Sequence, residues 1–380
     1  MTNNGNQHTR QNTIKTIGLY FHSLSGKGGG AERQLVQLAT ALASRGHHVH
    51  VITWDENTDV AFYPIPKSVH WHKLGLKAGF LGKLSRLQKL STTLKDNGIK
   101  TLVGFVIANN KVVILGALIS GTSLIAAERN GPTLYYVKHN FFSRWINFLS
   151  LLFCKRVALQ FSDFIDGYPR FLHSRMRVIP NAILPSLKKA CPGIPEKKAF
   201  QMLFIGRLDS LQKQPTILVN AFAKIADENP DWHLKIVGDG EAWEPLFTLI
   251  RALGIADRVT LTPSTLNVGP FYEGADLFVI SSLWEGSPNS LAEAMAHGLP
   301  AVGFNVDGVS QLIQDKVTGW IVPTIEETAL AETLSQAIAS PKKLANMGAA
   351  AQKATLPYQE NMIYDQWQEL ILSVGKNNGI

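Results

Sequence analysis

Residues 281–300 read SSLWEGSPNSLAEAMAHGLP and hold two carboxylates, Glu285 and Glu293, on either side of an expected helix start. Glu285 falls in the loop before the helix, whereas Glu293 lies roughly 9 Å along the helix axis, at about 1.5 Å per residue. A carboxylate accepts two hydroxyl hydrogen bonds, which suits a cis-diol or adjacent sugar hydroxyls. Two glutamates at this spacing are ordinarily surface residues, so the residues around them decide their interpretation.

The residues around this helix mark its two ends. Ser287 is a favoured N-cap, Pro288 suits the first helical position, and Gly298 can end the helix in a left-handed conformation. The expected helix is about ten residues long, and the free N–H groups of its first turn form an anion site. This layout fits a nucleotide sugar, with the diphosphate at the helix start, the ribose toward Glu293 and the transferred sugar toward Glu285.

The stretch 285–300, EGSPNSLAEAMAHGLP, resembles the signature E-G-x-P-N-x-x-x-E-A-M-A-x-G-x-P of the retaining family-4 glycosyltransferases. The resemblance implies an α/β fold of the glycosyltransferase-B type, in which two Rossmann-like domains with parallel sheets face each other across a cleft. It also implies a catalytic role for Glu285, and donor binding by Glu293, Gly286, Ser287, Pro288, Asn289 and Ser290. In this family the leaving phosphate deprotonates the acceptor on the front face of the sugar without a required metal. No D-x-D metal signature is evident near the expected site, and no metal ligands are assigned.

Length and composition indicate a soluble globular chain with two domains. The 380 residues exceed one ordinary core, 45% of them are hydrophobic, and the mean hydropathy is +0.03. Cys154 and Cys191 form no CxxC motif, so neither a disulfide framework nor a structural zinc site is expected. The polar N-terminus carries no apolar signal core, and the apolar run 112–127 falls short of the roughly 20 residues of a membrane span. We therefore expect a cytoplasmic protein, in which residues 112–127 form a buried helix followed by a strand.

Alternating strand and helix patterns predict two doubly wound, parallel sheets. In the first half, strands are expected at 16–21, 48–53, 101–106 and 123–126, and helices at 31–45 and 81–95. In the second half, strands are expected at 201–205, 233–237, 259–261, 277–280 and 301–303, and helices at 215–226, 244–253 and 290–297. Because residues 185–200 are rich in Pro and Lys and lack periodicity, a linker is predicted at 184–198, between domains 1–183 and 199–357. In proteins of the resembled fold the C-terminal helix, here 358–380, crosses back to the first domain.

The second half places two cations after its first strand. The sequence FIGRLDSLQKQ delivers Arg207 and Lys213 to the carboxyl edge of the sheet, where α/β proteins bind ligands and where two cations suit a diphosphate leaving group. The family pattern is G-R-L followed by a lysine, and the interval to Lys213 is one residue longer here. Gly238, in IVGDG, resembles a strand end at which glycine lets the nucleotide approach the backbone. The loop 259–271 does not identify the base; a UDP-sugar is the favoured co-substrate, and no further cofactor is expected.

A glycine-rich loop in the first half offers a second anion-binding backbone. It lacks the order and the Ser or Thr of a P-loop. A dinucleotide-binding loop is an imperfect match, with Asp55 as its ribose-binding residue. The sequence GGAER resembles the N-terminal glycosyltransferase block, whose glycines face the donor phosphates. Gly29 and Gly30 are therefore predicted to bind the donor.

The acceptor side is predicted at Glu128, Arg129 and Asn130. Many family members carry a histidine after an apolar strand here, and this chain lacks it. Members that extend lipid-linked oligosaccharides carry an S-E-R-N-like sequence instead, which these residues resemble. Arginine could bind an acceptor diphosphate in a bidentate manner, although Glu128 and Arg129 could also simply pair with each other. Asn181 resembles a V-I-P-N segment that ends the first domain, where it serves equally well as a turn residue.

The positive charge of the chain lies entirely in its first half. Residues 1–183 hold 22 Lys and Arg against 8 Asp and Glu, a net +14, which leaves 15 against 21, a net −6, for residues 184–380. Lysines accompany leucines along 73–95, and cations alternate with aromatic residues along 135–156, a composition that favours contact with anionic lipid. Ordinary core helices with a lysine-rich solvent face are the alternative. No nucleic-acid-binding module is visible, so nucleic acid is not an expected partner.

These features together predict a retaining hexosyl- or N-acetylhexosaminyltransferase of bacterial surface polysaccharide synthesis. The expected acceptor is a polyprenyl-diphosphate-linked glycan, and the enzyme is expected to be peripheral on the inner face of the cell membrane. Three alternatives stay open: a nucleotide-sugar epimerase that does not use NAD, a dehydrogenase built on the glycine-rich loop, and a non-catalytic nucleotide-sugar-binding protein.

Overall fold

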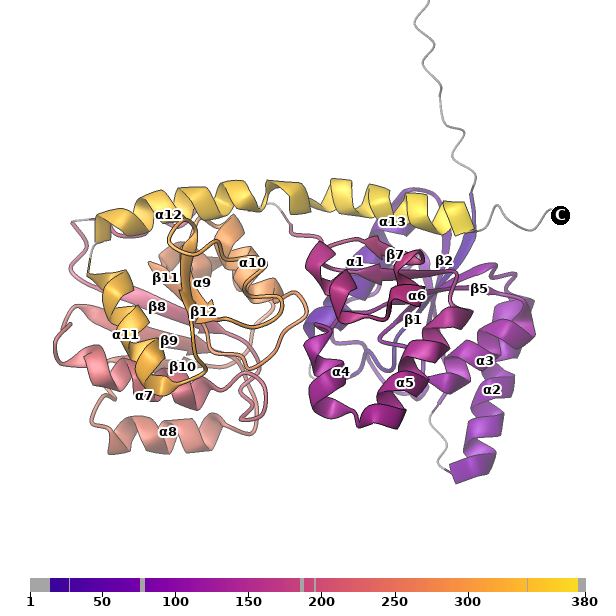
Figure 1. Ribbon diagram of the computed structural model, residues 1–380, viewed down its shortest axis with the longest axis horizontal. Coiled ribbons are helices and arrows are strands. Elements are labelled where there is room, and N and C mark those ends of the chain that lie inside the picture. The colour runs from indigo at the N-terminus through magenta and orange to yellow at the C-terminus, as the bar shows by residue number, and fades with distance from the viewer. Residues whose placement is uncertain are drawn as a thin grey trace, which may run out of the picture. The chain divides into compact units, whose positions relative to one another are not determined.

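Two parallel β-sheets with flanking helices make up the fold (Figure 1). The computed structural model describes residues 14–26, 28–75, 79–184, 188–194, 196–339 and 341–374. Within these residues the first sheet has seven strands in the order β3-β2-β1-β4-β5-β6-β7, and the second has six in the order β10-β9-β8-β11-β12-β13. In both sheets the strand order reverses next to the first strand of the series, so the predicted doubly wound arrangement is confirmed.

The first sheet is built from the N-terminal half of the chain. Its strands are β1 (Thr16–Tyr20), β2 (His48–Thr53), β3 (Val69–Lys73), β4 (Thr101–Phe105), β5 (Ser123–Ala127), β6 (Arg156–Leu159) and β7 (Met176–Val178). The α-helices of this half are α1 (Gly30–Ser44), α2 (Gly79–Asp96), α3 (Lys111–Ser120), α4 (Thr133–Lys138), α5 (Phe141–Ser150) and α6 (Arg170–His173). The central strand β1 pairs in parallel with β2 and β4, and all residues of β4 are buried, as expected for a strand covered on both faces.

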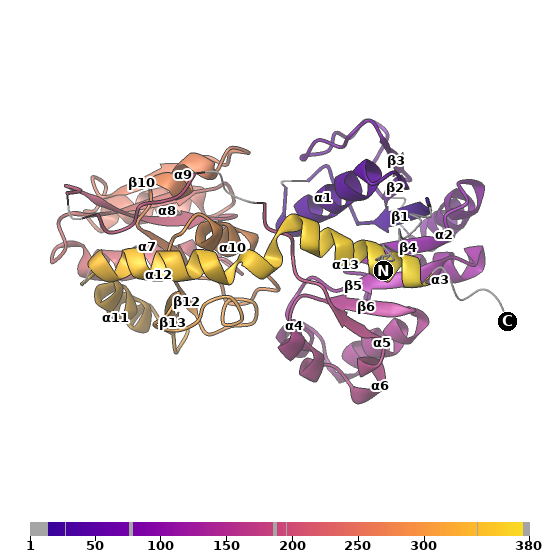
Figure 2. The same cartoon turned by 90° about the horizontal axis from the view of Figure 1, so that it is seen from above.

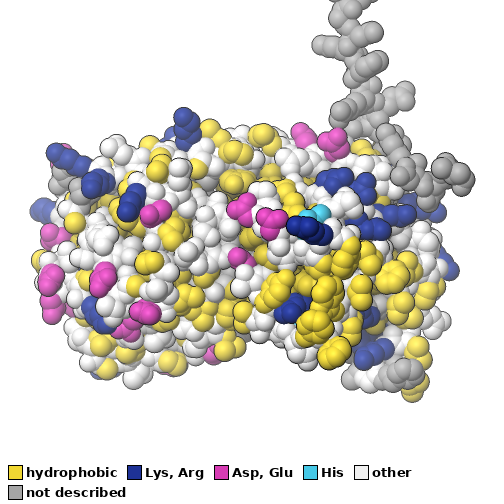
Figure 3. All heavy atoms as spheres, viewed as in Figure 1, with side chains coloured by type: hydrophobic (Ala, Val, Ile, Leu, Met, Phe, Trp, Pro, Cys, Tyr) yellow, Lys and Arg dark blue, Asp and Glu magenta, His cyan; other side chains and the backbone are white. Residues whose placement is uncertain are grey.

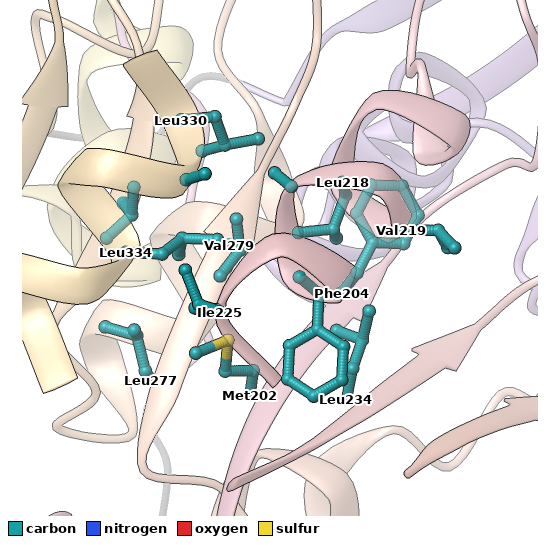
Figure 4. Close-up of a cluster of buried hydrophobic side chains, with 14 of the residues drawn as sticks. Met202, Phe204, Leu218, Val219, Ile225, Leu234, Leu277, Val279, Leu330 and Leu334 are labelled. Atoms are coloured by element: carbon teal, nitrogen blue, oxygen red, sulfur yellow. The ribbon is translucent and has the colours of Figure 1, made fainter. Parts of the chain in front are cut away.

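The second sheet carries a large hydrophobic core. Its strands are β8 (Phe200–Ile205), β9 (Trp232–Val237), β10 (Val259–Thr262), β11 (Leu277–Ile280), β12 (Ala301–Phe304) and β13 (Gly319–Val322). The α-helices of this half are α7 (Pro215–Ala226), α8 (Trp243–Ala252), α9 (Gly269–Gly274), α10 (Asn289–Ala296), α11 (Glu327–Ile338), α12 (Pro341–Ala354) and α13 (Glu360–Val374). Side chains from β8, α7 and α11 interlock over the sheet, among them Phe204, Leu218 and Leu334 (Figure 4). Figure 2 shows the chain from above, with α10 beside α12, and these two helices pack against each other.

Chain contacts divide the described residues into two compact units. One is drawn from Met1–Ala127, Leu149–Val157 and Gln368–Ile380, and the other from Glu128–Phe148 and Ala158–Trp367. Within the first unit, the ammonium group of Lys15 donates to the Leu372 carbonyl at 3.2 Å. The domain boundaries around 184–198 stay a prediction, and part of that linker lies outside the described residues, as does the end of the predicted helix 358–380.

The longer predicted elements are confirmed to within a residue or two, and residues 112–127 do form a helix followed by a strand. The helix α3 is only partly buried, contrary to the prediction, because Leu115, Leu118 and Ile119 are exposed. The strands β3, β6, β7 and β13 were not predicted from the sequence. Three of them have four residues or fewer, too short a run to be recognised. The fourth, β3, reads VHWHK and does alternate, but only over five residues. Among the described residues, no helix combines the length and apolar composition needed to cross a bilayer.

A histidine cluster joins β2 to the edge strand β3. His50 lies opposite His70 in the parallel register, and its Nδ1 lies 2.9 Å from Nε2 of His72. The rings of His50 and His70 are stacked with centroids 5.1 Å apart. Burial, and then the neighbouring histidines His72, His70 and His48, lower the pKa of His50 from 6.5 to about 4.

Acidification should therefore destabilise the folded chain. Between pH 6.5 and pH 4 the unfolded chain binds a proton at His50 that the folded chain excludes, so this stability is present above pH 6.5 and is lost as the pH falls toward 4. The expected loss is on the order of 1–3 kcal/mol of unfolding free energy. Urea unfolding of wild type and His50→Asn at pH 7.5 and pH 5 measures it. An equal pH dependence in both proteins would show that His50 does not supply the effect.

Candidate active site

Helix α10 begins at Asn289, directly after the loop that carries Glu285. The residue before the helix is Pro288, which has an extended conformation (φ −69°, ψ 106°), and no side chain caps the helix start. The prediction of Ser287 as N-cap and Pro288 as first helical residue is therefore wrong by one position, because the extended Pro288 cannot be part of the helix. Gly298 has φ +82°, the left-handed conformation that the sequence predicted. The N–H groups of the first turn lie at the helix start, the position at which helices bind anions.

Glu285 forms a buried ion pair with Lys213. The Lys213 ammonium lies 2.5 Å from Oε1 of Glu285, and the two side chains are 17% and 8% exposed. The interval before Lys213, one residue longer than in the family pattern, forms a turn. This turn ends at Gln214, which has the left-handed conformation (φ +48°). Two residues that the sequence predicted as catalytic are thus brought into direct contact from positions 72 residues apart.

Arg207, unlike Lys213, is largely exposed and pairs with a different carboxylate. Its side chain is 57% exposed, and its Nε donates to Oδ2 of the buried Asp209 at 2.8 Å. Asp209 also accepts from the backbone N–H of Gln212 at 2.6 Å and of Lys213 at 3.2 Å. Burial alone would raise the pKa of Asp209, but the hydrogen bonds from Arg207, Gln212 and Lys213 lower it below its ordinary value. Asp209 therefore shapes the turn that presents both cations, a role that the sequence analysis missed.

The turn that carries the cations is tied to the loop before α10. The Gln212 side chain donates to the Trp284 carbonyl at 2.9 Å, and the Gln212 carbonyl accepts from the N–H of Leu283 at 2.8 Å. The Ser281 hydroxyl donates to the carbonyl of Lys213 at 2.8 Å. These bonds fix the position of Lys213 relative to Glu285 through the backbone as well as through the ion pair.

Gly238 lets the end of β9 approach the start of the same turn. A Cβ atom at Gly238 would lie against the Gly206 carbonyl oxygen, far inside the 3.0 Å that real Cβ contacts respect. The glycine is thus required by backbone packing within the protein, whether or not a nucleotide also approaches it.

Gly238→Ala should displace the segment 206–208 and with it Arg207. We expect a loss of about 1–3 kcal/mol of unfolding free energy together with weaker donor binding, because backbone atoms must move to make room. The matched control is Gly274→Ala in α9, where an added Cβ meets nothing within 4 Å. Thermal unfolding and nucleotide titration of both variants provide the measurement, and an unchanged Gly238→Ala protein would contradict the packing argument.

Glu293 lies one and a half turns into α10 and is half-buried. The hydroxyl of the fully buried Tyr272, from α9, donates to Oε2 of Glu293 at 3.1 Å. The Tyr272 ring packs on His297 with centroids 4.8 Å apart. Tyr272 thereby orients the Glu293 carboxylate, another contact that the sequence analysis did not anticipate.

The glycine-rich loop in the first unit is held by Asp55. This carboxylate is buried and accepts from the Ser23 hydroxyl at 2.5 Å, the Leu24 N–H at 2.8 Å and the Ser25 hydroxyl at 2.7 Å. Asp55 therefore holds the loop and is not presented to a ribose, which removes the basis of the dinucleotide interpretation. Gly29 is the extended residue before α1, and Gly30 is its first residue; Lys27 lies outside the described residues.

The predicted acceptor residues Glu128 and Arg129 follow β5 and are buried. The Tyr135 hydroxyl donates to Oε2 of Glu128 at 2.5 Å, and Nη1 of Arg129 donates to Oδ1 of Asn181 at 3.1 Å. The Arg129 guanidinium also stacks over the Trp367 ring, 5.3 Å from its centroid. Burial lowers the pKa of Arg129 to about 10, so the guanidinium stays charged at neutral pH.

Within the second unit, this segment reaches the loop before α10. The N–H of Gly131, next to the half-buried Asn130, donates to the Glu285 carbonyl at 3.1 Å. Asn181 donates to Oδ1 of Asn289 at 2.8 Å and to the carbonyl of Ser287 at 3.2 Å. A Cβ at Gly286 would collide with the Arg129 carbonyl, so only glycine fits beside this segment. Asn181 is therefore more than a turn residue, because it links Arg129 to the start of α10.

The chain is similar in sequence to known proteins. Residues 189–354 match the family model described as glycosyl transferases group 1. An "uncharacterized glycosyltransferase" of Haemophilus influenzae is 28% identical over 371 residues, which cover 94% of this chain and all of the relative. The Campylobacter jejuni GalNAc-alpha-(1->4)-GalNAc-alpha-(1->3)-diNAcBac-PP-undecaprenol alpha-1,4-N-acetyl-D-galactosaminyltransferase is 26% identical over 361 residues, covering 91% of this chain and 96% of the relative.

The fold is also that of solved glycosyltransferases. The crystal structure of Anabaena Alr3699/HepE in complex with UDP and glucose superposes with a TM-score of 0.77 at 20% identity, covering 94% of this chain and 99% of that one. Residues 189–354 are therefore similar to the group 1 glycosyltransferases, and the two parallel α/β sheets have the glycosyltransferase-B fold.

Proposed function

We propose that the protein is a retaining glycosyltransferase that moves a hexose or N-acetylhexosamine from a nucleoside-diphosphate sugar to a glycan acceptor. The observation that carries the proposal is the buried Lys213–Glu285 pair, set in the loop that leads into α10. A cation, a sugar-binding carboxylate and a helix start together match the parts of a nucleotide sugar. A UDP-sugar is the favoured donor, in keeping with the UDP and glucose named for Anabaena Alr3699/HepE.

On the donor side, Arg207 and Lys213 neutralise the departing nucleotide diphosphate, assisted by the positive end of the α10 dipole. Such electrostatic stabilisation of the leaving group is the largest catalytic contribution that we expect. Glu293 binds the ribose hydroxyls, with its carboxylate oriented by Tyr272. Glu285 binds hydroxyls of the transferred sugar. The Lys213 ammonium, which pairs with Glu285, also stabilises the negative charge of the diphosphate.

The transfer itself proceeds on the front face of the sugar. The bond from the anomeric carbon to the leaving phosphate breaks, the acceptor oxygen bonds to that carbon from the same side, and the phosphate takes the acceptor's proton. Neither Glu285 nor Glu293 attacks the anomeric carbon. With two side-chain cations at the diphosphate, we expect no metal requirement, so activity should persist in EDTA.

The acceptor proposed is a polyprenyl-diphosphate-linked glycan of bacterial surface polysaccharide synthesis. Arg129, kept charged in its buried position, is suited to the acceptor diphosphate, and Glu128 and Asn130 to its sugar hydroxyls. The relative from Campylobacter jejuni is named for an undecaprenol-diphosphate-linked glycan. Such a substrate resides in a membrane, so we propose that the enzyme works as a peripheral protein on the inner face of the cell membrane.

A donor screen tests this proposal against its alternatives. The purified protein is incubated with UDP-, GDP- and ADP-sugars, with and without a membrane-lipid extract, and nucleotide release and lipid glycosylation are followed by mass spectrometry. Release that depends on the extract and yields a glycosylated lipid supports the transferase. Conversion of the donor sugar to its epimer would establish the epimerase instead, and binding without turnover would establish a binding protein.

A further inference from the structure

The helices α4 and α5 expose an unusually apolar surface. Figure 3 shows hydrophobic side chains gathered over these helices, with basic side chains among and beside them. The large apolar side chains there are between 37% and 77% exposed. We call this surface the aromatic face; it consists of Tyr136, Val137, Phe141, Phe142, Trp145, Ile146 and Phe171.

The rings of the aromatic face pack on one another. The Phe141 centroid lies 5.8 Å from that of Phe142 and 6.0 Å from that of Trp145. Trp145 in turn stacks on Phe171 at 6.3 Å. The opposite side of α5 is anchored in the protein by the buried Phe148. The helix is thus firmly seated through one side while its aromatic side faces solvent, and exposed patches of this kind mark interaction surfaces.

The segment that carries α4 and α5 has charges of one sign. Residues 131–162 contain Lys138, Arg144, Lys155 and Arg156 but no Asp or Glu. The Arg144 guanidinium lies over the Tyr136 ring at 4.4 Å and near the Phe141 ring at 5.9 Å. In this segment cations alternate with aromatic rings, and no carboxylate is present. Such a surface complements one whose outer groups are anionic and whose interior is apolar.

We infer that the aromatic face docks into the interface of an anionic lipid bilayer. Aromatic side chains favour the level of the lipid headgroups, where their rings are buried and their polar atoms stay wet. Lys and Arg add roughly 1 kcal/mol each near an anionic membrane surface. The segment 131–162 supplies such cations and no carboxylate, and the exposed Asp163 and Asp166 follow it in the chain.

The docking surface is continuous with the predicted acceptor residues. Helix α4 carries Tyr135, whose hydroxyl bonds to Glu128, immediately before the exposed Tyr136. Docking of α4 would therefore bring Glu128 and Arg129 close to the headgroup level, where the diphosphate of a lipid-linked acceptor lies. This link rests on the proposed function, whereas docking itself can be measured without donor or acceptor.

The test is sedimentation of the full chain with vesicles that contain no lipid-linked glycan. Wild type should bind phosphatidylglycerol–phosphatidylethanolamine vesicles, and the double substitution Phe141→Ser with Phe142→Ser should weaken binding at least about tenfold. The matched control is Phe247→Ser on α8, a 49% exposed phenylalanine with Arg251 lying 5.8 Å from its ring centroid. Arg144→Gln should weaken binding about fivefold, and Arg251→Gln should not.

Equal vesicle binding by wild type and the Phe141/Phe142 variant would overturn the inference. So would a loss of binding in Phe247→Ser as large as in that variant, or binding to neutral phosphatidylcholine as tight as to anionic lipid. Vesicle-independent self-association that the double variant abolishes would also overturn it, by assigning the face to a second copy of the chain. Transfer to a water-soluble acceptor analogue by the double variant should equal that of wild type. Loss of vesicle binding with this transfer intact separates docking from catalysis, and absence of transfer in both proteins would count against the proposed function alone.

Discussion

Glu285→Ala should lower turnover at least about 100-fold, equivalent to roughly 2.7 kcal/mol of transition-state stabilisation. The carboxylate is buried, accepts from Lys213 at 2.5 Å and lies in the loop that leads into α10. Its removal would deprive the transferred sugar of its hydroxyl-binding partner and leave the Lys213 ammonium without its neighbour. Single-turnover release of nucleotide from the donor in the presence of acceptor measures the effect.

The control for Glu285 must separate lost chemistry from lost folding. Glu285→Gln keeps the shape of the side chain and should also be slow, while its thermal unfolding stays near that of wild type. Glu327→Ala removes the carboxylate of another Lys–Glu pair, Lys224–Glu327 at 2.9 Å, and should retain full activity. A folded Glu285→Ala enzyme with a near-normal rate would refute the assignment of the site.

Lys213→Met should lower turnover by about two to three orders of magnitude, the range seen when one preorganised charge-stabilising donor is removed. The Lys213 side chain is 17% exposed. Glu285 holds its ammonium, and Ser281 and Asp209 hold its backbone. Methionine keeps the length and apolar stem of lysine but removes the charge that would stabilise the leaving diphosphate. The rate of nucleotide release at saturating donor is the quantity to compare.

A double substitution tests whether Lys213 and Glu285 act together. Because Lys213 and Glu285 act on one bound donor, Lys213→Met with Glu285→Gln should cost much less than the product of the two single effects. Lys224→Met serves as the surface control, since that lysine is 46% exposed. Full activity in Lys213→Met, or strictly multiplicative losses, would mean that this ammonium does not act with Glu285 on the donor.

The sequence was informative where function is concentrated in a contiguous segment. The frame EGSPNSLAEAMAHGLP predicted the loop, the helix and its glycine terminus, with an error of one residue at the start. The turn residues Arg207 and Lys213 could be proposed because they follow a long, regular strand. In these cases local preference and the final fold agree.

Other parts of the site depend on contacts that only the folded chain creates. Asp209 shapes the turn because its carboxylate accepts hydrogen bonds from the N–H groups of Gln212 and Lys213. The sequence R-L-D alone does not predict these bonds. Tyr272 reaches Glu293 from a different helix, 21 residues away. The position of Asp55 after β2 suits a ribose ligand. That position alone does not predict its burial or its hydrogen bonds with Ser23, Leu24 and Ser25.

The most direct test of the central claim is the anomeric configuration of the product. The full-length protein is given an α-linked, isotope-labelled UDP-sugar and a polyprenyl-diphosphate-linked glycan in the presence of EDTA, and the glycolipid product is examined by NMR. Our account predicts that the labelled sugar is transferred with its α configuration retained, and that Glu285→Ala forms this product at least about 100-fold more slowly. A β-linked product, or a donor that binds and is never transferred to the lipid-linked glycan, would contradict it.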